Sequence, residues 1–191
     1  MSTPHQSPVD IPADAPVHAE GLILDYHPVP CTIAANPSAI QVDCPAGSYA
    51  ELEGTRFALA QFHLHCPSEH TFAGAHAPAA LHLVHGSTDS ELAVVSVVFE
   101  VGPANPALDP LIAALGGTEP ARKIDPAGLL PDDRSYVAYE GSLTTPPYTE
   151  GVRCRVLVNA STLSAAQLAA LDEVHRGNNL PLQPINDRSF E

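Results

Sequence analysis

Apolar and polar residues alternate over much of the N-terminal half of the chain, as they do in β-strands that bury one face. Turn residues separate the alternating segments, notably Asn36-Pro37, Pro45-Ala46-Gly47 and Gly54. The strands predicted here cover residues 32–35, 39–44, 48–53 and 56–65. Farther along, strands are predicted over residues 81–84, 92–101, 135–140 and 151–159. The run 92–101 is rich in β-branched residues, as expected of a fully buried strand.

Two segments have helical signals instead. Residues 105–117 predict a short helix that ends at Gly116-Gly117, and Ser164 followed by Gln167 is a capping box that starts a second helix. The second helix places three apolar residues inward and ends at Gly177. These residues are Leu168, Leu171 and Val174. The proline-rich residues 1–30 are predicted to be irregular, and no repeat or linker is visible. We therefore predict a single α+β domain over residues 1–191, dominated by a mixed sheet.

The charge balance limits the partners. The chain has 191 residues, 8 of them basic and 22 acidic, which gives a net charge of −14 at pH 7. Nucleic acids and anionic membranes both attract basic surfaces, so we expect neither as a partner. No apolar run is long enough to span a membrane. The N-terminus has neither the basic start nor the apolar run of a signal peptide, which favours a cytoplasmic location.

The four cysteines form no C-x-x-C pair, so a cysteine zinc ribbon is not expected. Cys31 and Cys44 lie symmetrically about the turn Asn36-Pro37-Ser38-Ala39, where they would be cross-strand neighbours in a hairpin. A disulfide between them and two reduced thiols both remain open. A cytosolic location favours the thiols.

Histidines supply the candidate chemistry. His63 and His65 lie two residues apart on a predicted strand, so their side chains share one face. His82 and His85 are three residues apart on a second apolar run, so only one of them can join the pair. Three imidazoles from neighbouring strands can hold a tetrahedral zinc ion with an open fourth position, which is the catalytic arrangement. Spacing alone leaves open which of His82 and His85 is the third ligand, and whether the histidines are simply core and surface residues.

Five segments resemble the α-class carbonic anhydrases, and they occur in the same order along the chain. They are QSPVDI, QFHLHCPSEHT, LHLVH, YEGSLTTPP and PLQPINDR, between Gln6 and Arg188. The resemblance implies a large, twisted, mostly antiparallel central sheet with short peripheral helices. It also implies reversible hydration of CO2 to bicarbonate and a proton by a zinc-bound hydroxide. Finally, it selects His82 as the third zinc ligand and leaves His85 as a hydrogen-bonded core histidine.

The same resemblance assigns the other site residues. Thr144 would accept a hydrogen bond from the zinc-bound hydroxide and donate one to Glu69, because an ionised carboxylate can only accept. Gln61 would accept a hydrogen bond from a zinc-ligating histidine. The remaining assignments form the substrate pocket, in which Thr145 would contact bicarbonate and an apolar wall suits a nonpolar linear substrate. The wall residues are Val84, Val94, Leu143 and Val152.

The chain departs from the family pattern at several positions. Ala80 stands where the family usually has a glutamate two residues before the third ligand, which changes the support of His82. Ser38 stands at the position of the proton-shuttle histidine of fast members, so we expect slow proton export that imidazole buffer accelerates, unless His5 or His18 acts instead. The chain has no tryptophan. Small residues such as Cys154 in place of large rings leave a wider cavity or an exposed patch, and a homodimer that covers the patch is a hypothesis.

An alternative to the enzyme remains. A carbonic anhydrase-related zinc-binding module would keep the fold with little or no turnover. Because His63, His65 and His82 are all retained together with Thr144 and Glu69, the enzyme is the favoured interpretation.

Overall fold

A curled ten-stranded sheet forms the centre of the computed structural model, which describes residues 4–30, 32–36, 39–115, 123–175 and 177–191. The path through the sheet runs β13-β14-β11-β10-β7-β5-β4, with β2 and β6 paired beside β7 and β15 beside β11. The strands of this sheet are β2 (Leu22–Asp25), β4 (Thr32–Asn36), β5 (Ala39–Asp43), β6 (Tyr49–Leu52), β7 (Thr55–His65), β10 (Ala79–Gly86), β11 (Leu92–Val101), β13 (Tyr136–Ser142), β14 (Glu150–Leu157) and β15 (Ser161–Leu163). Strand β11 pairs in parallel with β14 and β15, and the other pairs of this sheet are antiparallel. This confirms the predicted β-dominated α+β fold.

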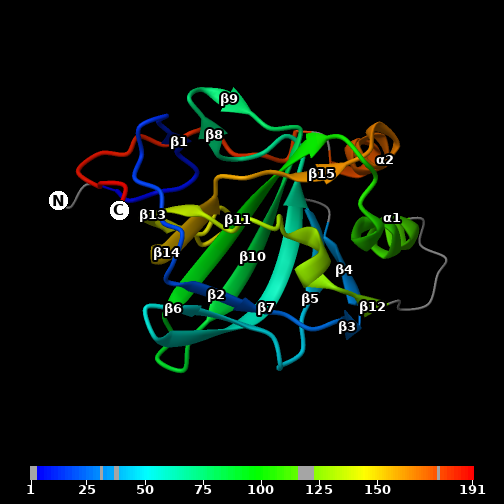
Figure 1. Ribbon diagram of the computed structural model, residues 1–191, viewed down its shortest axis with the longest axis horizontal. Coiled ribbons are helices and arrows are strands. Elements are labelled where there is room, and N and C mark those ends of the chain that lie inside the picture. Colours follow the sequence, from blue (N-terminus) through cyan, green and yellow to red (C-terminus); the bar gives the residue numbers. More distant parts are fainter. Residues whose placement is uncertain (1–3, 31, 37–38, 116–122, 176) are drawn as a thin grey trace.

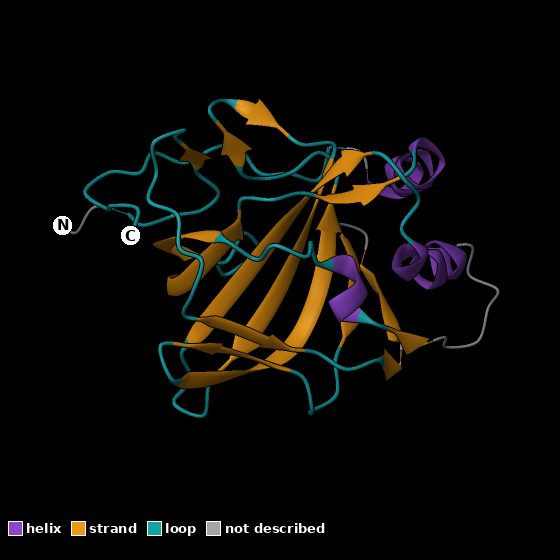
Figure 2. Cartoon of the chain, viewed as in Figure 1, coloured by secondary structure: helices purple, strands orange, loops and turns teal. Residues whose placement is uncertain are grey.

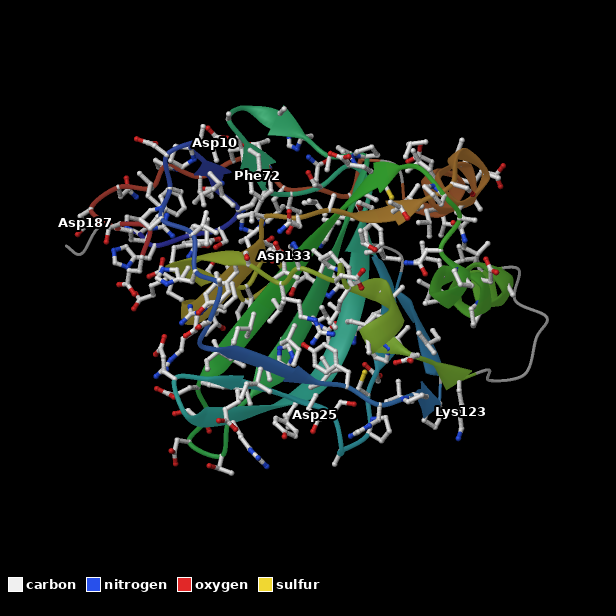
Figure 3. The ribbon with its side chains drawn as sticks, viewed as in Figure 1. Asp10, Asp25, Phe72, Lys123, Asp133 and Asp187 are labelled. Carbon is white, nitrogen blue, oxygen red and sulfur yellow. The ribbon has the colours of Figure 1, made fainter. Side chains whose placement is uncertain are left out.

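Short elements surround the sheet (Figures 1 and 2). Strand β1 (Asp10–Ile11) pairs with β8 (Thr71–Phe72), which pairs with β9 (Ala75–His76), and Figure 3 shows the labelled side chains of Asp10 and Phe72 close together at this small sheet. Strand β3 (Val29–Pro30) pairs with β12 (Lys123–Ile124). The helices are η1 (Pro106–Leu108), α1 (Asp109–Leu115), η2 (Pro126–Leu129) and α2 (Ala165–His175). In the described residues, no helix is long and apolar enough to cross a membrane.

The two faces of the sheet have different roles. One face packs into the larger apolar cluster, which includes Leu111 of α1 and Leu171 of α2. The smaller cluster, with Val84, Val94 and Cys154, lies on the other face. Side chains alternate between faces along a strand, so the same alternation that builds the main core also places the histidine pair of β7 opposite it.

Some local predictions are confirmed and others are wrong. The capping box is confirmed, because Gln167 N donates to Ser164 Oγ at 3.1 Å and Ser164 N donates to Gln167 Oε1 at 3.0 Å. The inward position of Val174 is wrong, since its side chain lies near the helix end and is 47% exposed. The N-terminal region is also less irregular than predicted, because β2 pairs with β6 in the main sheet. The predicted helix end at Gly116-Gly117 lies outside the described residues.

Candidate metal centre

Three neighbouring strands present the site residues as a regular grid. In the row at the centre, His63 of β7, His82 of β10 and Ser96 of β11 lie directly opposite one another. One row away are Gln61, Val84 and Val94, and on the other side are His65, Ala80 and Val98. Residues in register on antiparallel strands share a face, so the side chains of all three rows point to the same side of the sheet.

His63, His65 and His82 come together within this grid. Each is only 3–4% exposed, and one ring nitrogen from each lies within 4.8 Å of the other two. Among the described residues, no other His, Cys, Asp or Glu joins this group. His85 points to the opposite face, where its Nε2 lies 2.8 Å from the Tyr26 hydroxyl. The structure therefore selects His82 over His85, and His85 is the hydrogen-bonded core histidine that was expected.

Hydrogen bonds identify the nitrogen that each ring presents. Nδ1 of His63 lies 2.8 Å from Gln61 Oε1, and Nδ1 of His65 lies 3.2 Å from the Asn178 carbonyl oxygen, which directs both Nε2 atoms to the centre. His65 Nε2 and His82 Nδ1 each lie 3.5 Å from the same atom, Glu69 Oε2. Nδ1 of His82 is therefore the nitrogen on the side of the metal centre. Zinc–nitrogen bonds of about 2.0–2.1 Å require nitrogens roughly 3.3 Å apart, which modest ring movements reach from this arrangement. The residues fit a zinc ion.

Burial favours the neutral rings that a metal needs. Burial, together with the neighbouring His65, lowers the pKa of His63 to about 3. The pKa of His82 lies well below its usual value, first because of burial and then because of the adjacent histidines. A neutral imidazole has a free lone pair to coordinate a metal, so these rings are ready ligands at neutral pH.

Glu69 lies behind the histidines with its side chain fully buried. Its Oε1 accepts a hydrogen bond from Leu180 N at 3.0 Å. Burial raises the pKa of Glu69 to about 7, while hydrogen bonds from the Thr144 hydroxyl and from Leu180 N act in the opposite direction. The structure therefore pairs Thr144 with Glu69, as the family resemblance implies.

A cavity of about 50 Å³ opens beside the imidazoles of His63 and His82. Apolar residues and the two threonines line one part of it, and polar groups of the site line the rest. The lining residues are Ser7, Gln61, His63, His70, His82, Val84, Val94, Ser142, Leu143, Thr144, Thr145 and Cys154. Of the predicted wall residues, Val152 is not among them and is instead fully buried in the smaller apolar cluster, beside Val84 and Val94. A small, largely apolar cavity beside a metal site suits a small neutral substrate.

Comparisons with known proteins agree with this site. Residues 1–189 match the family model described as eukaryotic-type carbonic anhydrase. The chain belongs to the α-carbonic anhydrase family. A carbonic anhydrase of Klebsiella pneumoniae is 41% identical over 192 residues, which span 96% of this chain and 78% of that protein. The α-carbonic anhydrase of Thermovibrio ammonificans, solved with the inhibitor sulfanilamide, has a TM-score of 0.88 at 37% identity over 97% of this chain and 86% of that one. Dioscorin, solved with ascorbate, has a TM-score of 0.87 at 30% identity over 97% of this chain and 84% of that one.

The departures from the carbonic anhydrase pattern have specific places in the structure. Ala80 is 2% exposed and lies on the same face as His82, two residues before it. Cys154 lines the cavity, and burial raises the pKa of its thiol to about 11. Ser38, the shuttle position, and Cys31, the first cysteine of the hairpin pair, lie outside the described residues.

Sequence reasoning missed a polar network next to the metal ligands. His70 Nε2 lies 2.7 Å from the Tyr139 hydroxyl, which lies 2.8 Å from Ser7 Oγ. Ser7 Oγ in turn accepts a hydrogen bond from Ser142 N at 3.1 Å. All four residues lie in segments that carry the family resemblance: Ser7 in QSPVDI, His70 in QFHLHCPSEHT, and Tyr139 and Ser142 in YEGSLTTPP. These motifs were the available signal, but only the fold shows that the three segments meet.

Proposed function

We propose that the chain catalyses the reversible hydration of CO2 to bicarbonate and a proton at a zinc ion held by His63, His65 and His82. The observation that carries this proposal is the convergence of three buried imidazoles, two of which line a small cavity with an apolar wall. Zinc, when bound, supplies a hydroxide nucleophile at neutral pH, because it lowers the pKa of a coordinated water to about 7, a value known for carbonic anhydrase itself. Cobalt or iron could also bind three imidazoles, so zinc is part of the proposal.

Thr144 and Glu69 orient the nucleophile in this proposal. The Thr144 hydroxyl donates a hydrogen bond to the buried Glu69 carboxylate, so its oxygen lone pairs face the metal centre as acceptors. The Thr144 oxygen would accept a hydrogen bond from the nucleophile, which would leave a lone pair of the nucleophile facing the substrate carbon. Leu180 N fixes the carboxylate from the other side. Thr144 and Glu69 therefore act by orienting the nucleophile.

The cavity wall receives CO2. Val84, Val94 and Leu143 offer a surface without charge or hydrogen-bonding groups, which matches a nonpolar molecule. Val152 supports Val84 and Val94 from behind. Thr145 lies at the edge of the same cavity, where it would contact the more polar product, bicarbonate.

A stopped-flow CO2-hydration assay tests the proposal. The zinc-loaded protein should hydrate CO2 rapidly, and removal of zinc with a chelator should abolish the activity. His82→Ala should lose both zinc and activity. The matched control is His85→Gln, because His85 is equally buried but points to the other face of the sheet. Loss of activity in both variants to the same extent would contradict the assigned roles.

Proton export from the site is proposed to be slow, because Ser38 occupies the shuttle position of the family. A serine hydroxyl does not exchange protons near neutral pH as imidazole does. Turnover should therefore rise with imidazole buffer concentration, and Ser38→His should reduce this dependence. A fast rate without added buffer would point to another shuttle. His5, which contacts Glu140 and Asp187, and His18, which stacks on Tyr136, are the candidates named above.

A second candidate function is a zinc-binding module with little or no turnover. One observation favours it: the side chain of Ala80 offers no hydrogen-bond acceptor to His82. Tight zinc binding without CO2 hydration in the same assay would support this candidate. A homodimer and a cytoplasmic location stay predictions, and light scattering tests the first.

A further inference from the structure

Besides the atoms that face the metal centre, three buried polar atoms on the site face have no hydrogen-bond partner among the described residues. They are His82 Nε2, His70 Nδ1 and Ser96 Oγ, and each of these residues is at most 3% exposed. More than nine in ten buried polar groups in folded proteins are hydrogen-bonded. Three exceptions in one place therefore require a common explanation.

The fold places Ser96 and His70 next to His82, and Ala80 on the same face two residues before it. Ser96 lies directly opposite His82 on the neighbouring strand, and such pairs have Cβ atoms about 4.5–5.5 Å apart. The ring centres of His70 and His82 are 5.8 Å apart. Ala80 precedes His82 by two residues, so its methyl group points to the same face and offers these atoms no acceptor.

We assign both unpartnered imidazole nitrogens as donors. If Ser7 donates to Tyr139 and Tyr139 donates to His70 Nε2, both hydroxyl protons are used and the His70 proton is on Nδ1. His82 presents Nδ1 to the metal centre, so its proton is on Nε2. The Ser96 hydroxyl can donate or accept. Two donors and a hydroxyl together require an oxygen acceptor with more than one lone pair.

We propose that His82 Nε2, His70 Nδ1 and Ser96 Oγ bind a small oxygen acceptor beside Ala80, supplied by a formate-sized carboxylate or by one water molecule. The acceptor fixes the tautomer and orientation of His82. In most metal sites, a protein group that accepts a hydrogen bond from the ligating histidine does this. Both His70 and His82 line the cavity, so the proposed position adjoins it. The inference rests on the proposed function only in assigning His82 Nδ1 to the metal.

The first test compares thermal unfolding of the metal-free protein in sodium formate and in sodium chloride of equal ionic strength. Formate at ten times its dissociation constant should raise the wild-type Tm by about 3–6 °C. The Tm of Ala80→Glu, which supplies its own carboxylate, should not change with formate. Ala80→Val, which adds apolar volume without an acceptor, is the matched control and should not respond either. Equal shifts in all three proteins would overturn the carboxylate source.

Zinc affinity gives a second readout on the same variants. Loss of a hydrogen-bond partner of a ligand typically costs 10–100-fold in metal affinity. Saturating formate should therefore bring the wild-type zinc dissociation constant close to that of Ala80→Glu. Zinc binding by Ala80→Val should stay weak with or without formate. This result would separate the effect from formate bound directly to zinc.

A crystal structure of the zinc-loaded wild-type protein, at a resolution that shows ordered water, decides between the sources. Carboxylate-shaped density within hydrogen-bond distance of His82 Nε2 and His70 Nδ1 supports the first source, and a single oxygen supports the second. Absence of any oxygen ligand there overturns the proposal, whatever the thermal data show. None of these readouts uses CO2 turnover, so failure here is distinguishable from failure of the proposed function.

Discussion

Gln61 Oε1 lies 2.8 Å from Nδ1 of His63, two residues farther along β7 on the same face of the sheet. The amide oxygen of Gln61 accepts a hydrogen bond from the protonated Nδ1 of His63, which leaves Nε2 unprotonated and able to bind the metal. Gln61→Leu should therefore weaken zinc binding about 10-fold or more, measured by competition with a chelator. Gln61→Glu keeps an acceptor and should bind zinc at least as tightly as the wild type. Equal zinc affinity of the leucine variant and the wild type would show that Gln61 does not support His63.

Thr144 should matter for turnover and not for metal binding. Thr144→Val removes the hydroxyl that links the reacting centre to Glu69, and loss of one such preorganised hydrogen bond typically costs about 100-fold or more in kcat. Thr144→Ser keeps the hydroxyl and should retain most of the activity. Zinc content of both variants, measured by atomic absorption, should match the wild type. A valine variant with near-normal kcat would refute the orienting role.

The fold was largely predictable where burial alone decides the structure. Strand β7 alternates from Gln61 to His65, after a register irregularity between Leu59 and Gln61, and β11 is a largely apolar run. Both strands lie where the pattern places them. The pair His63 and His65 follows from the same alternation. Spacing also showed that only one of His82 and His85 could join this histidine pair. The choice between them needed the register of β10 against β7.

Predictions failed where tertiary contacts decide the structure. Val174 has the right helical spacing to be buried, yet it lies at the end of α2 beyond the core that Leu171 reaches. Asn178, whose carbonyl oxygen approaches His65, is more than a hundred residues away in the sequence. No local pattern reports such a contact.

The stability of the protein should fall in acid because of buried neutral histidines. Burial lowers the pKa of His85 to about 4, whereas an unfolded chain has a histidine pKa of about 6.5. Between these values the unfolded state binds more protons, so the free energy of unfolding falls as the pH falls from 6.5 towards 4. One such histidine contributes about 1.4 kcal/mol per pH unit within this window.

Urea unfolding of the metal-free protein between pH 7 and pH 5 measures this dependence. His85→Gln keeps a polar side chain that does not titrate, so its unfolding free energy should fall less steeply than that of the wild type. Parallel slopes in the two proteins would show that His85 is protonated equally in both states.

His5 should have the opposite pH dependence, because hydrogen bonds to Glu140 and Asp187 raise its pKa. These contacts join the N-terminal segment to the C-terminal tail, and Figure 3 shows Asp187 at this end of the molecule. A raised pKa gives stability that is fully present below pH 6.5 and is lost as the pH rises through the folded-state value. His5→Ala should therefore be less stable than the wild type at pH 6 and nearly equal to it at pH 9. A difference in melting temperature that is the same at both pH values would contradict the ionic contribution.

The most direct test of the central claim is the zinc coordination in a crystal structure of the zinc-loaded protein. The account predicts one zinc ion bound by His63 Nε2, His65 Nε2 and His82 Nδ1 at about 2.0–2.1 Å, with a solvent oxygen as the fourth ligand. A fourth ligand from the protein, such as Glu69, or a zinc ion bound elsewhere would contradict it.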